Sequence, residues 1–186
     1  MKPITIVLTE GYSDWEIAPL AGVGKAFYGA DIRFVSPDGG SLTSIAGLHV
    51  SDIERFEAPD EGVVVICGGP AFEQRAPDIA AGLQKAREAG CIIAAICGGT
   101  IALAHAGMLD NVAHTSNGPG YLQQHAVDYG GADFYVDQPK ALRAGDIITS
   151  PAPAPASFAA EVLAAAGLDP LKAQELRDML GKEHSK

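Results

Sequence analysis

Four short apolar runs recur along the chain, and each is followed by a turn of polar residues or glycine. They are Ile4–Leu8 and Ile32–Val35, which each contain one polar residue, and Val63–Ile66 and Ile92–Ile96, which are continuously apolar. Continuous apolar runs of this length are typical of strands that are covered on both faces, as in parallel sheets. The hydrophobic pattern therefore predicts a set of buried core strands.

Segments with helical patterns separate these runs. Ser13 or Asp14 can cap a helix that Gly29 closes, and Pro19 falls in its first turns, where proline is tolerated. Further helices are predicted at 79–89, 100–105, 121–127, 156–166 and 170–180, a hairpin at 42–50 around Gly47, short strands at 112–116, 134–136, 141–143 and 147–149, and a frayed tail at 181–186. The alternation of strands and helices predicts an α/β sandwich with a mainly parallel sheet, in a single domain over residues 1–186.

The composition is that of an acidic globular protein. The chain has 186 residues, of which 47% are hydrophobic and 19% are charged, so it can bury a sizeable core. It carries 13 basic and 23 acidic residues, which gives a formal net charge of −10. Because no basic run offsets this charge, we expect no binding to nucleic acid or to an anionic membrane surface.

The N-terminus and the cysteines predict a cellular location. The opening residues, MKPITIVLTEG, contain an apolar run that is too short for a signal peptide or a membrane span, so we expect a cytoplasmic protein. Cys67, Cys91 and Cys97 are odd in number, and none has CxxC spacing. They fit a reducing compartment, and they predict neither a disulfide framework nor a structural zinc site. We expect no metal and no cofactor.

The stretch CIIAAICGGT, residues 91–100, has the pattern of a nucleophile elbow. A buried strand runs into Cys97, then into Gly98 and Gly99, and a helical pattern follows over 100–105. In such an elbow the reactive side chain lies on a cramped strand-to-helix turn that needs small neighbours. The helix N-terminus would favour the thiolate of Cys97. The alternative is that Cys97 is only a small buried hydrophobic residue.

Sites in doubly wound folds lie at the carboxyl ends of the parallel strands. Three turns, at 9–16, 67–70 and 97–100, should therefore converge. If the strands before Cys67 and Cys97 are neighbours, the N–H groups of Gly69 and Gly98 can form an oxyanion hole for a group bonded to Cys97. The alternative for the glycine pair at 68–69 is an ordinary turn.

Two further side chains are candidates to assist Cys97. Glu16 lies in the first turn of a helix that starts at the edge of the site, either as an exposed acid or as a partly buried one. A buried Glu16 would be protonated and would hydrogen-bond the sulfur. Of the five histidines, His114 in AHTSNG is the best candidate for a general base, although a structural role is the alternative.

These motifs together resemble the DJ/PfpI superfamily, which includes the parkinsonism-associated deglycase, ThiJ-like proteins and PfpI-type proteases. The motifs are EGYSDWE, VVVICGG, AAICGGT, AHTSNG and DIITSPAPAPASFAAEVL, and they cover nearly the whole chain in the right order. The resemblance implies a flavodoxin-like three-layer sandwich, a homodimer and a nucleophile at Cys97. It also implies that Glu16 is the acid bonded to the cysteine and that Gly69 and Gly98 supply the oxyanion N–H groups.

The chain departs from the family at positions that bear on function. PfpI-type proteases carry a histidine directly after the nucleophile, where this chain has Gly98, and the histidine of the deglycase type falls on Asn117. Cys67 replaces a proline that often precedes the glycine pair. A second thiol near Cys97 suggests a redox switch, against the alternative of a small buried residue. The late region lacks the His-x-Glu of glutamine amidotransferases, which argues against glutaminase activity.

The sequence thus predicts cysteine-dependent chemistry on a small electrophilic carbonyl compound such as an α-oxoaldehyde. The reaction would be of hydrolase, hydratase or glyoxalase type, with proton transfer by His114 or by Glu16 itself. The alternative is a non-enzymatic oxidative-stress protein or chaperone in which Cys97 senses oxidant. The two differ in whether a base lies within reach of Cys97.

Overall fold

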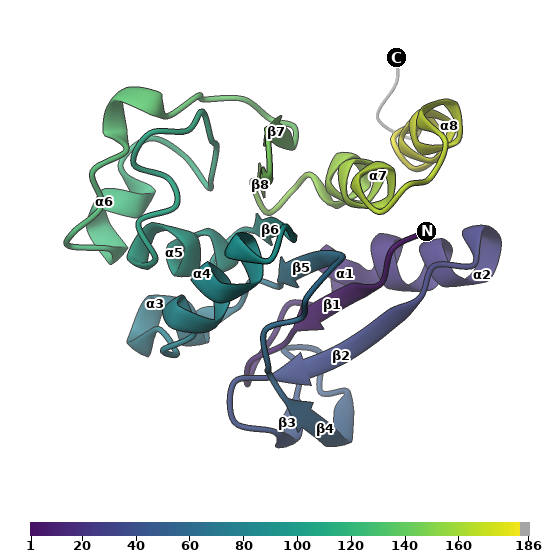
Figure 1. The fold of residues 1–186 in the computed structure, drawn as a ribbon, viewed down its shortest axis with the longest axis horizontal. Helices are drawn as coiled ribbons and strands as arrows, with labels where there is room; N and C mark the ends of the chain where they lie inside the picture. Colours follow the sequence, from purple (N-terminus) through teal and green to yellow (C-terminus); the bar gives the residue numbers. More distant parts are fainter. Residues whose placement is uncertain (183–186) are drawn as a thin grey trace.

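A computed structural model describes residues 1–182, and its central feature is an eight-stranded sheet with the order β3-β4-β2-β1-β5-β6-β8-β7 (Figure 1). The predicted tail falls partly outside these residues, at 183–186. The strands are β1 (Ile4–Val7), β2 (Ile32–Ser36), β3 (Gly40–Thr43), β4 (His49–Arg55), β5 (Val63–Ile66), β6 (Ile92–Ile96), β7 (Leu142–Ala144) and β8 (Ile147–Ser150).

The sheet is mainly parallel, as the sequence predicts. β1 pairs in parallel with both β2 and β5, β5 pairs with β6, and β6 pairs with β8. Antiparallel pairing occurs where β3 meets β4 and where β7 meets β8, at the two ends of the sheet. The hairpin predicted around Gly47 is β3 with the start of β4. β1 is the strand at which the chain changes direction across the sheet, which in such folds is where sites form.

Helices cover both faces of the sheet, so the fold is the expected three-layer sandwich (Figure 1). Val63 and Val65 pack under one layer, whereas Val64 and Ile66 pack under the other, because successive side chains of a strand alternate. The first layer holds α1 (Asp14–Ala18), the π-helical turn η1 (Pro19–Val23), α2 (Gly24–Tyr28), α7 (Pro155–Ala165) and α8 (Pro170–Leu180). The second holds α3 (Pro70–Arg75), α4 (Ala80–Glu88), α5 (Gly99–His105) and α6 (Tyr121–His125).

Two predicted strands are wrong, and one helix was not predicted. Residues 112–116 form no strand: His114 makes a single bridge to Tyr135, and the N–H of Thr115 donates to the Thr149 side chain at 2.8 Å instead of to a ladder. The segment predicted as a strand at 134–136 begins in the last residue of the 3₁₀ helix η2 (Ala132–Phe134) and forms only the bridge at Tyr135. Helix α3 was missed because Pro70, interpreted as the end of a turn, is its first residue.

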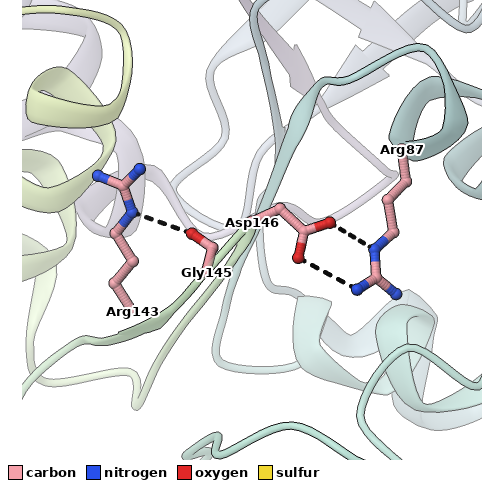
Figure 2. Close-up of polar contacts among 4 residues, drawn as sticks. All are labelled: Arg87, Arg143, Gly145 and Asp146. Carbon is pink, nitrogen blue, oxygen red and sulfur yellow. Dashed lines mark hydrogen bonds and ion pairs between the residues drawn. The ribbon is translucent and has the colours of Figure 1, made fainter.

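An ion pair fixes the second layer to the end of the sheet opposite the site. Arg87 at the end of α4 holds both carboxylate oxygens of Asp146, at 2.7 and 3.1 Å (Figure 2). Asp146 lies in the predicted turn between β7 and β8, and the same turn accepts a hydrogen bond from Arg143 at the Gly145 carbonyl. Among residues 1–182, no helix is both long and apolar enough to cross a membrane.

Candidate active site

The three predicted turns converge at the carboxyl ends of β1, β5 and β6, which are neighbouring strands. The first turn and the second are joined directly. The N–H of Ser13 donates to the Gly68 carbonyl at 3.0 Å, and the N–H of Gly68 donates to Glu16 Oε2 at 2.8 Å. The strand register places Ile66 beside Ala95, so Cys67 and Cys97 both lie just beyond the sheet at this edge.

Cys97 occupies a strained elbow. Its φ of 56° lies in the left-handed region, which costs a residue other than glycine about 1–2 kcal/mol. The surrounding structure holds it there: its N–H donates to the Ser150 carbonyl of β8 at 2.9 Å, and its own carbonyl accepts from the Thr100 hydroxyl at 2.6 Å. Gly98 already has helical angles and opens α5. This is the strand–nucleophile–helix geometry that CIIAAICGGT predicts.

Gly68 makes room for the contact between the acid and the nucleophile. A Cβ at this position would stand 2.5 Å from Glu16 Oε2 and 2.7 Å from the Cβ of Cys97. Both distances are shorter than real carbon contacts, so Glu16 and Cys97 can approach each other only across a glycine.

Glu16 is the buried alternative of the two that the sequence leaves open, because its exposed fraction is 0%. Its Oε2 accepts the Gly68 N–H, and its carboxyl also interacts with the Cys97 thiol and the Ser13 side chain. Oε1 has no partner of standard hydrogen-bond geometry within residues 1–182. Burial raises the pKa of Glu16 to about 7, although the hydrogen bonds from Cys97, Gly68 and Ser13 oppose the shift. Near neutral pH this carboxyl can therefore both take and give a proton.

Burial also raises the pKa of the Cys97 thiol, to about 12, and the charge of Glu16 adds to the effect. Hydrogen bonds from Asn117 and from the Gly98 N–H act in the opposite direction. The net shift of the Cys97 pKa is therefore away from the thiolate. The helix-end N–H does favour the thiolate as expected, but desolvation is larger. A carboxyl that can accept the thiol proton is correspondingly important.

Asn117 donates a hydrogen bond to the nucleophile, from Nδ2 to Cys97 Sγ at 3.3 Å. Its other amide atom, Oδ1, accepts the Ala152 N–H at 3.0 Å, which fixes which end of the amide faces the sulfur. The neighbouring Ser116 hydroxyl lies 2.7 Å from that of Thr100 on α5, so the loop is held against the elbow helix. The sequence marked Asn117 only as a possible neighbour of the site.

His114, the predicted base, has both ring nitrogens engaged by other groups. Its side chain is buried, with Nδ1 2.6 Å from the Val112 carbonyl oxygen and Nε2 hydrogen-bonded to the Tyr129 hydroxyl. Burial lowers its pKa, and its ring makes edge contacts with Tyr129 and Tyr135. In the described part of the chain no hydrogen bond joins it to Cys97. This environment corresponds to the structural role that the sequence left open as its alternative.

The second thiol lies on the other side of the acid. Cys67 has an exposed fraction of 0%, and its Sγ lies 3.5 Å from the Ser13 carbonyl oxygen and 4.0 Å from Glu16 Oε2. Burial, followed by the charge of Glu16, raises its pKa well above the usual range of a thiol. Cys91 lies just before β6, at the opposite edge of the sheet, where its Sγ contacts the Pro59 carbonyl. Cys67 and Cys97 therefore share Glu16, and Cys91 is remote from it.

The two glycines predicted to hold an oxyanion are adjacent. A Cβ built on Gly98 would stand 3.4 Å from the Gly69 nitrogen and 2.9 Å from the Gly69 carbonyl oxygen. Gly69 precedes the first residue of α3, and Gly98 precedes the first residue of α5. The neighbouring strands β5 and β6 therefore bring the starts of two helices together beside Cys97.

Two residues near the site were missed from the sequence. Tyr121 on α6 donates its hydroxyl hydrogen to Glu73 Oε1 on α3 at 2.7 Å, and its hydroxyl would lie 3.6 Å from a Cβ on Gly98. The sequence holds no signal that pairs positions 48 residues apart. Residues 1–182 contain no group of three His, Cys, Asp or Glu side chains placed to hold a metal ion.

A small pocket is lined in part by Asn117. Its volume is about 320 Å³, and it is lined by Ser116, Asn117, Gly118, Asp137, Gln138, Pro139, Pro151 and Pro153. The predicted proline–alanine segment after β8 thus forms one wall of this pocket, and Asn117, which contacts Cys97, forms part of another.

Comparison with known proteins agrees with this geometry. The solved structure of the DJ-1 superfamily protein Atu0886 from Agrobacterium tumefaciens is 34% identical, with a TM-score of 0.89 over 100% of both chains. That of a thiJ/pfpI family protein from Bacillus anthracis is 28% identical, with a TM-score of 0.84 over 99% of this chain and 92% of the other.

A relative from Bacillus subtilis, named uncharacterized protease YoaZ, is 33% identical over 126 residues, which is 66% of this chain. The match spans only 60% of that relative's own length. The family model described as the DJ-1/PfpI family matches residues 2–165. The chain therefore belongs to the DJ-1/PfpI family.

Proposed function

We propose that this protein is a cysteine-dependent enzyme that acts on a small electrophilic carbonyl compound, of which an α-oxoaldehyde is the first candidate. Membership in a family with protease-named relatives fits a cysteine hydrolase type of role in general. The observation that carries the finer proposal is the contact of a strained Cys97 with a fully buried Glu16 whose pKa is raised to about 7.

In the first step the sulfur of Cys97 attacks the carbonyl carbon, and the thiol proton passes to the ionised carboxyl of Glu16. The S–C bond forms while the carbonyl π electrons move to oxygen. The N–H groups of Gly98 and Gly69 are the donors for that oxygen. Because burial and the Glu16 charge both raise the thiol pKa, transfer of the proton to Glu16 removes one of the two obstacles as the bond forms.

In the second step Glu16 returns its proton. On an α-oxoaldehyde adduct, a base moves the aldehyde C–H proton to the adjacent carbon, which gives a thioester of a 2-hydroxy acid. Water then cleaves the C–S bond, and the thiol is regenerated with one water consumed and no change in net oxidation state. We assign the proton transfers to Glu16 rather than to His114, because both ring nitrogens of His114 are already hydrogen-bonded.

The pocket beside Asn117 supports a small substrate. At about 320 Å³ it lies at the small end of ligand pockets, and Ser116, Asp137 and Gln138 add polar groups to a lining that is otherwise rich in proline. A polypeptide substrate is not proposed, because within residues 1–182 no histidine is hydrogen-bonded to Cys97.

The test is a rate assay with methylglyoxal on the wild type, Cys97→Ser and Glu16→Gln, with Cys91→Ser as the matched control. Cys91 lies just before the start of β6, at the opposite edge of the sheet. We expect Cys97→Ser to abolish turnover and Glu16→Gln to lower it by about 10²-fold or more. We expect Cys91→Ser to retain the wild-type rate once folding is verified by circular dichroism. Wild-type turnover that survives Cys97→Ser would contradict the proposal.

One observation favours a second candidate, an oxidant sensor. The N–H of Gly98, the amide of Asn117 and a protonated Glu16 surround the sulfur with donors that a sulfinate could use. The raised thiol pKa opposes this role, since peroxide reacts with thiolate. Selective gain of two oxygens at Cys97 in dilute peroxide, with no methylglyoxal turnover, would favour the sensor over the enzyme.

The homodimer and the cytoplasmic location stay predictions. Size-exclusion chromatography with light scattering would test the first, and a fluorescent fusion in the native cell would test the second.

A further inference from the structure

A row of polar side chains leads from an exposed carboxylate to Cys97. It runs from Glu73 on α3 to Tyr121 on α6, then to Asn117 in the preceding loop, and ends at Cys97 Sγ. Two hydrogen bonds and the interaction of Tyr121 with Asn117 thus connect Cys97 to an exposed carboxylate.

The amide of Asn117 has both of its ends assigned. Oδ1 accepts from the Ala152 N–H, so Nδ2 with its two hydrogens faces the site. One hydrogen is directed at Cys97 Sγ, 3.3 Å from Nδ2, and the amide also interacts with the Tyr121 oxygen. Since Asn117 is largely exposed, its rotamer is held by these partners and not by packing.

Tyr121 can act toward Asn117 only as an acceptor. A tyrosine hydroxyl has a single hydrogen, and that of Tyr121 is donated to Glu73 Oε1 at 2.7 Å. Its lone pairs are therefore directed at the remaining neighbours, among them the Asn117 amide. Burial, followed by the hydrogen bond to Glu73, raises the pKa of Tyr121, so the phenol stays neutral and is a poor proton donor.

We propose that Tyr121 and Glu73 are positioning residues that hold the Asn117 amide as a hydrogen-bond donor to Cys97 Sγ. Glu73 orients the tyrosine hydroxyl, the tyrosine oxygen takes one amide hydrogen, and the other amide hydrogen is left directed at the sulfur. The chemical result is a larger thiolate fraction at Cys97. This inference rests on the proposed function, because a donor to the sulfur has a catalytic use only if Cys97 is the nucleophile.

The titratable groups around the sulfur come from several elements. Glu16 faces it from α1, Cys67 from the end of β5 and Tyr121 from α6, while Glu73 on α3 faces Tyr121. Ionised Glu16 opposes the thiolate, and the Asn117 donor favours it. Removal of the row should therefore lower the thiolate fraction at every pH below the thiol pKa.

The test measures the rate at which iodoacetamide alkylates Cys97 as a function of pH, by mass spectrometry of the intact folded protein. We expect alkylation at pH 8 to slow about tenfold in Asn117→Ala and about fivefold in Tyr121→Phe, with the pH midpoint raised. Glu73→Gln should remain within about twofold of the wild type, because its amide oxygen still accepts from the tyrosine. Tyr28→Phe on α2 is the matched control.

The double variant Tyr121→Phe/Asn117→Ala tests whether Tyr121 affects the alkylation of Cys97 through Asn117 or independently of it. If Tyr121 acts through Asn117, the double variant alkylates at the rate of Asn117→Ala alone. Additive losses, or a wild-type profile in Tyr121→Phe, would overturn the proposal. Alkylation needs no carbonyl turnover, so a failure of the proposed function appears separately, as wild-type protein that is inactive toward methylglyoxal. Where turnover exists, Tyr121→Phe should lower kcat and leave KM unchanged.

Discussion

Two neighbouring strands of this protein end in the same three residues, and the two turns have different structures. Cys67-Gly68-Gly69 follows β5, and Cys97-Gly98-Gly99 follows β6. The thiol of Cys67 is fully buried and faces the Ser13 carbonyl, whereas Cys97 is partly exposed and takes a left-handed backbone conformation. Identical tripeptides after adjacent parallel strands thus give one fully buried and one partly exposed sulfur.

The difference lies in where the chain turns. After β5 the ladder continues through Cys67, whose N–H donates to the Val7 carbonyl at 3.2 Å, and the unusual backbone angle comes at Gly69, with φ 156°. After β6 the chain turns at Cys97 itself, and Gly98 is already helical. Both cysteine N–H groups still donate to a neighbouring strand, so the two turns differ in the backbone angle at the cysteine itself: φ is positive at Cys97, whereas after β5 it first becomes positive at Gly69.

The largest expected contrast between the two turns is in chemical labelling. Native protein treated briefly with iodoacetamide should carry its label on Cys97, with Cys67 labelled at least about 10³-fold more slowly, because Cys67 reacts only after the site opens. Peptide mapping by mass spectrometry measures this ratio, and unfolding in urea should equalise the two cysteines. Comparable native rates would show that the two turns do not differ in the way their backbones suggest.

The fold could be predicted because it depends on apolar runs that local pattern reveals. The runs at 63–66 and 92–96 match β5 and β6 residue for residue, and the flanking glycines identify the elbow. The strand predicted at 112–116 failed because Thr115 satisfies its backbone with the side chain of Thr149, which lies 34 residues away and has no local signature.

The site could be predicted only where residues cluster in motifs. Glu16 and Cys97 lie in conspicuous stretches, and the structure brings them together. Nothing local indicates that Asn117 contacts Cys97, that Tyr121 reaches Glu73, or that the ring of His114 is already occupied. The helix-end donor at Cys97 could be predicted from the glycines, but the opposing effect of burial depends on three-dimensional packing, which no local pattern shows.

The carboxyl between the two turns predicts an unusual dependence of stability on pH. Burial raises the pKa of Glu16 from 4.5 to about 7, so the folded state binds its proton more tightly than the unfolded state does. The associated stability is fully present below about pH 4.5 and is lost as pH rises through about 7. At about 1.4 kcal/mol per pKa unit, the loss amounts to about 3 kcal/mol by pH 9.

Glu16→Gln should remove this loss, since a neutral amide of the same shape still accepts from the Gly68 N–H. Urea unfolding at pH 5 and pH 9 measures it. From pH 5 to pH 9 the unfolding free energy of the variant, relative to that of the wild type, is expected to rise by about 3 kcal/mol. The variant should nevertheless lose activity. If the unfolding free energies of the two proteins depend on pH in the same way, Glu16 does not have the raised pKa expected of a buried carboxyl between the turns.

Gly68, which separates the acid from the nucleophile, offers a smaller perturbation. A methyl group there meets Glu16 Oε2 and the Cβ of Cys97, so Gly68→Ala should cost about 1–3 kcal/mol of unfolding free energy and push the two apart. Gly22→Ala is the matched control, because a Cβ at Gly22 meets no heavy atom within 4 Å. Thermal unfolding and methylglyoxal turnover are the measurements. If Gly68→Ala and Gly22→Ala change stability and turnover equally, Glu16 and Cys97 are not packed closely against Gly68.

The smallest expected effect comes from Asp146 at the opposite edge of the sheet. Its pKa is shifted in the direction opposite to that of Glu16. Arg87 lowers the pKa of Asp146, through the hydrogen bond of Figure 2 and its charge, so the associated stability is present above the usual aspartate pKa and is lost as pH falls. The side chains of Arg87 and Asp146 are 35% and 44% exposed, and solvent screening keeps the contribution of such a pair below about 1 kcal/mol.

Asp146→Asn should therefore lower the free energy of unfolding by less than about 1 kcal/mol at pH 7 and leave it unchanged at pH 3. The rate of methylglyoxal turnover should stay at the wild-type value. Urea unfolding in low and high salt checks the assignment, because an exposed ion pair weakens as salt is added, whereas the effect of the buried Glu16 does not. A loss at Asp146 as large as the shift at Glu16 would mean that exposure does not separate the two carboxylates. The opposite pH slopes expected of Glu16 and Asp146 then make each variant the control for the other: burial without a cation stabilises the protonated acid, and a cation without burial stabilises the charged one.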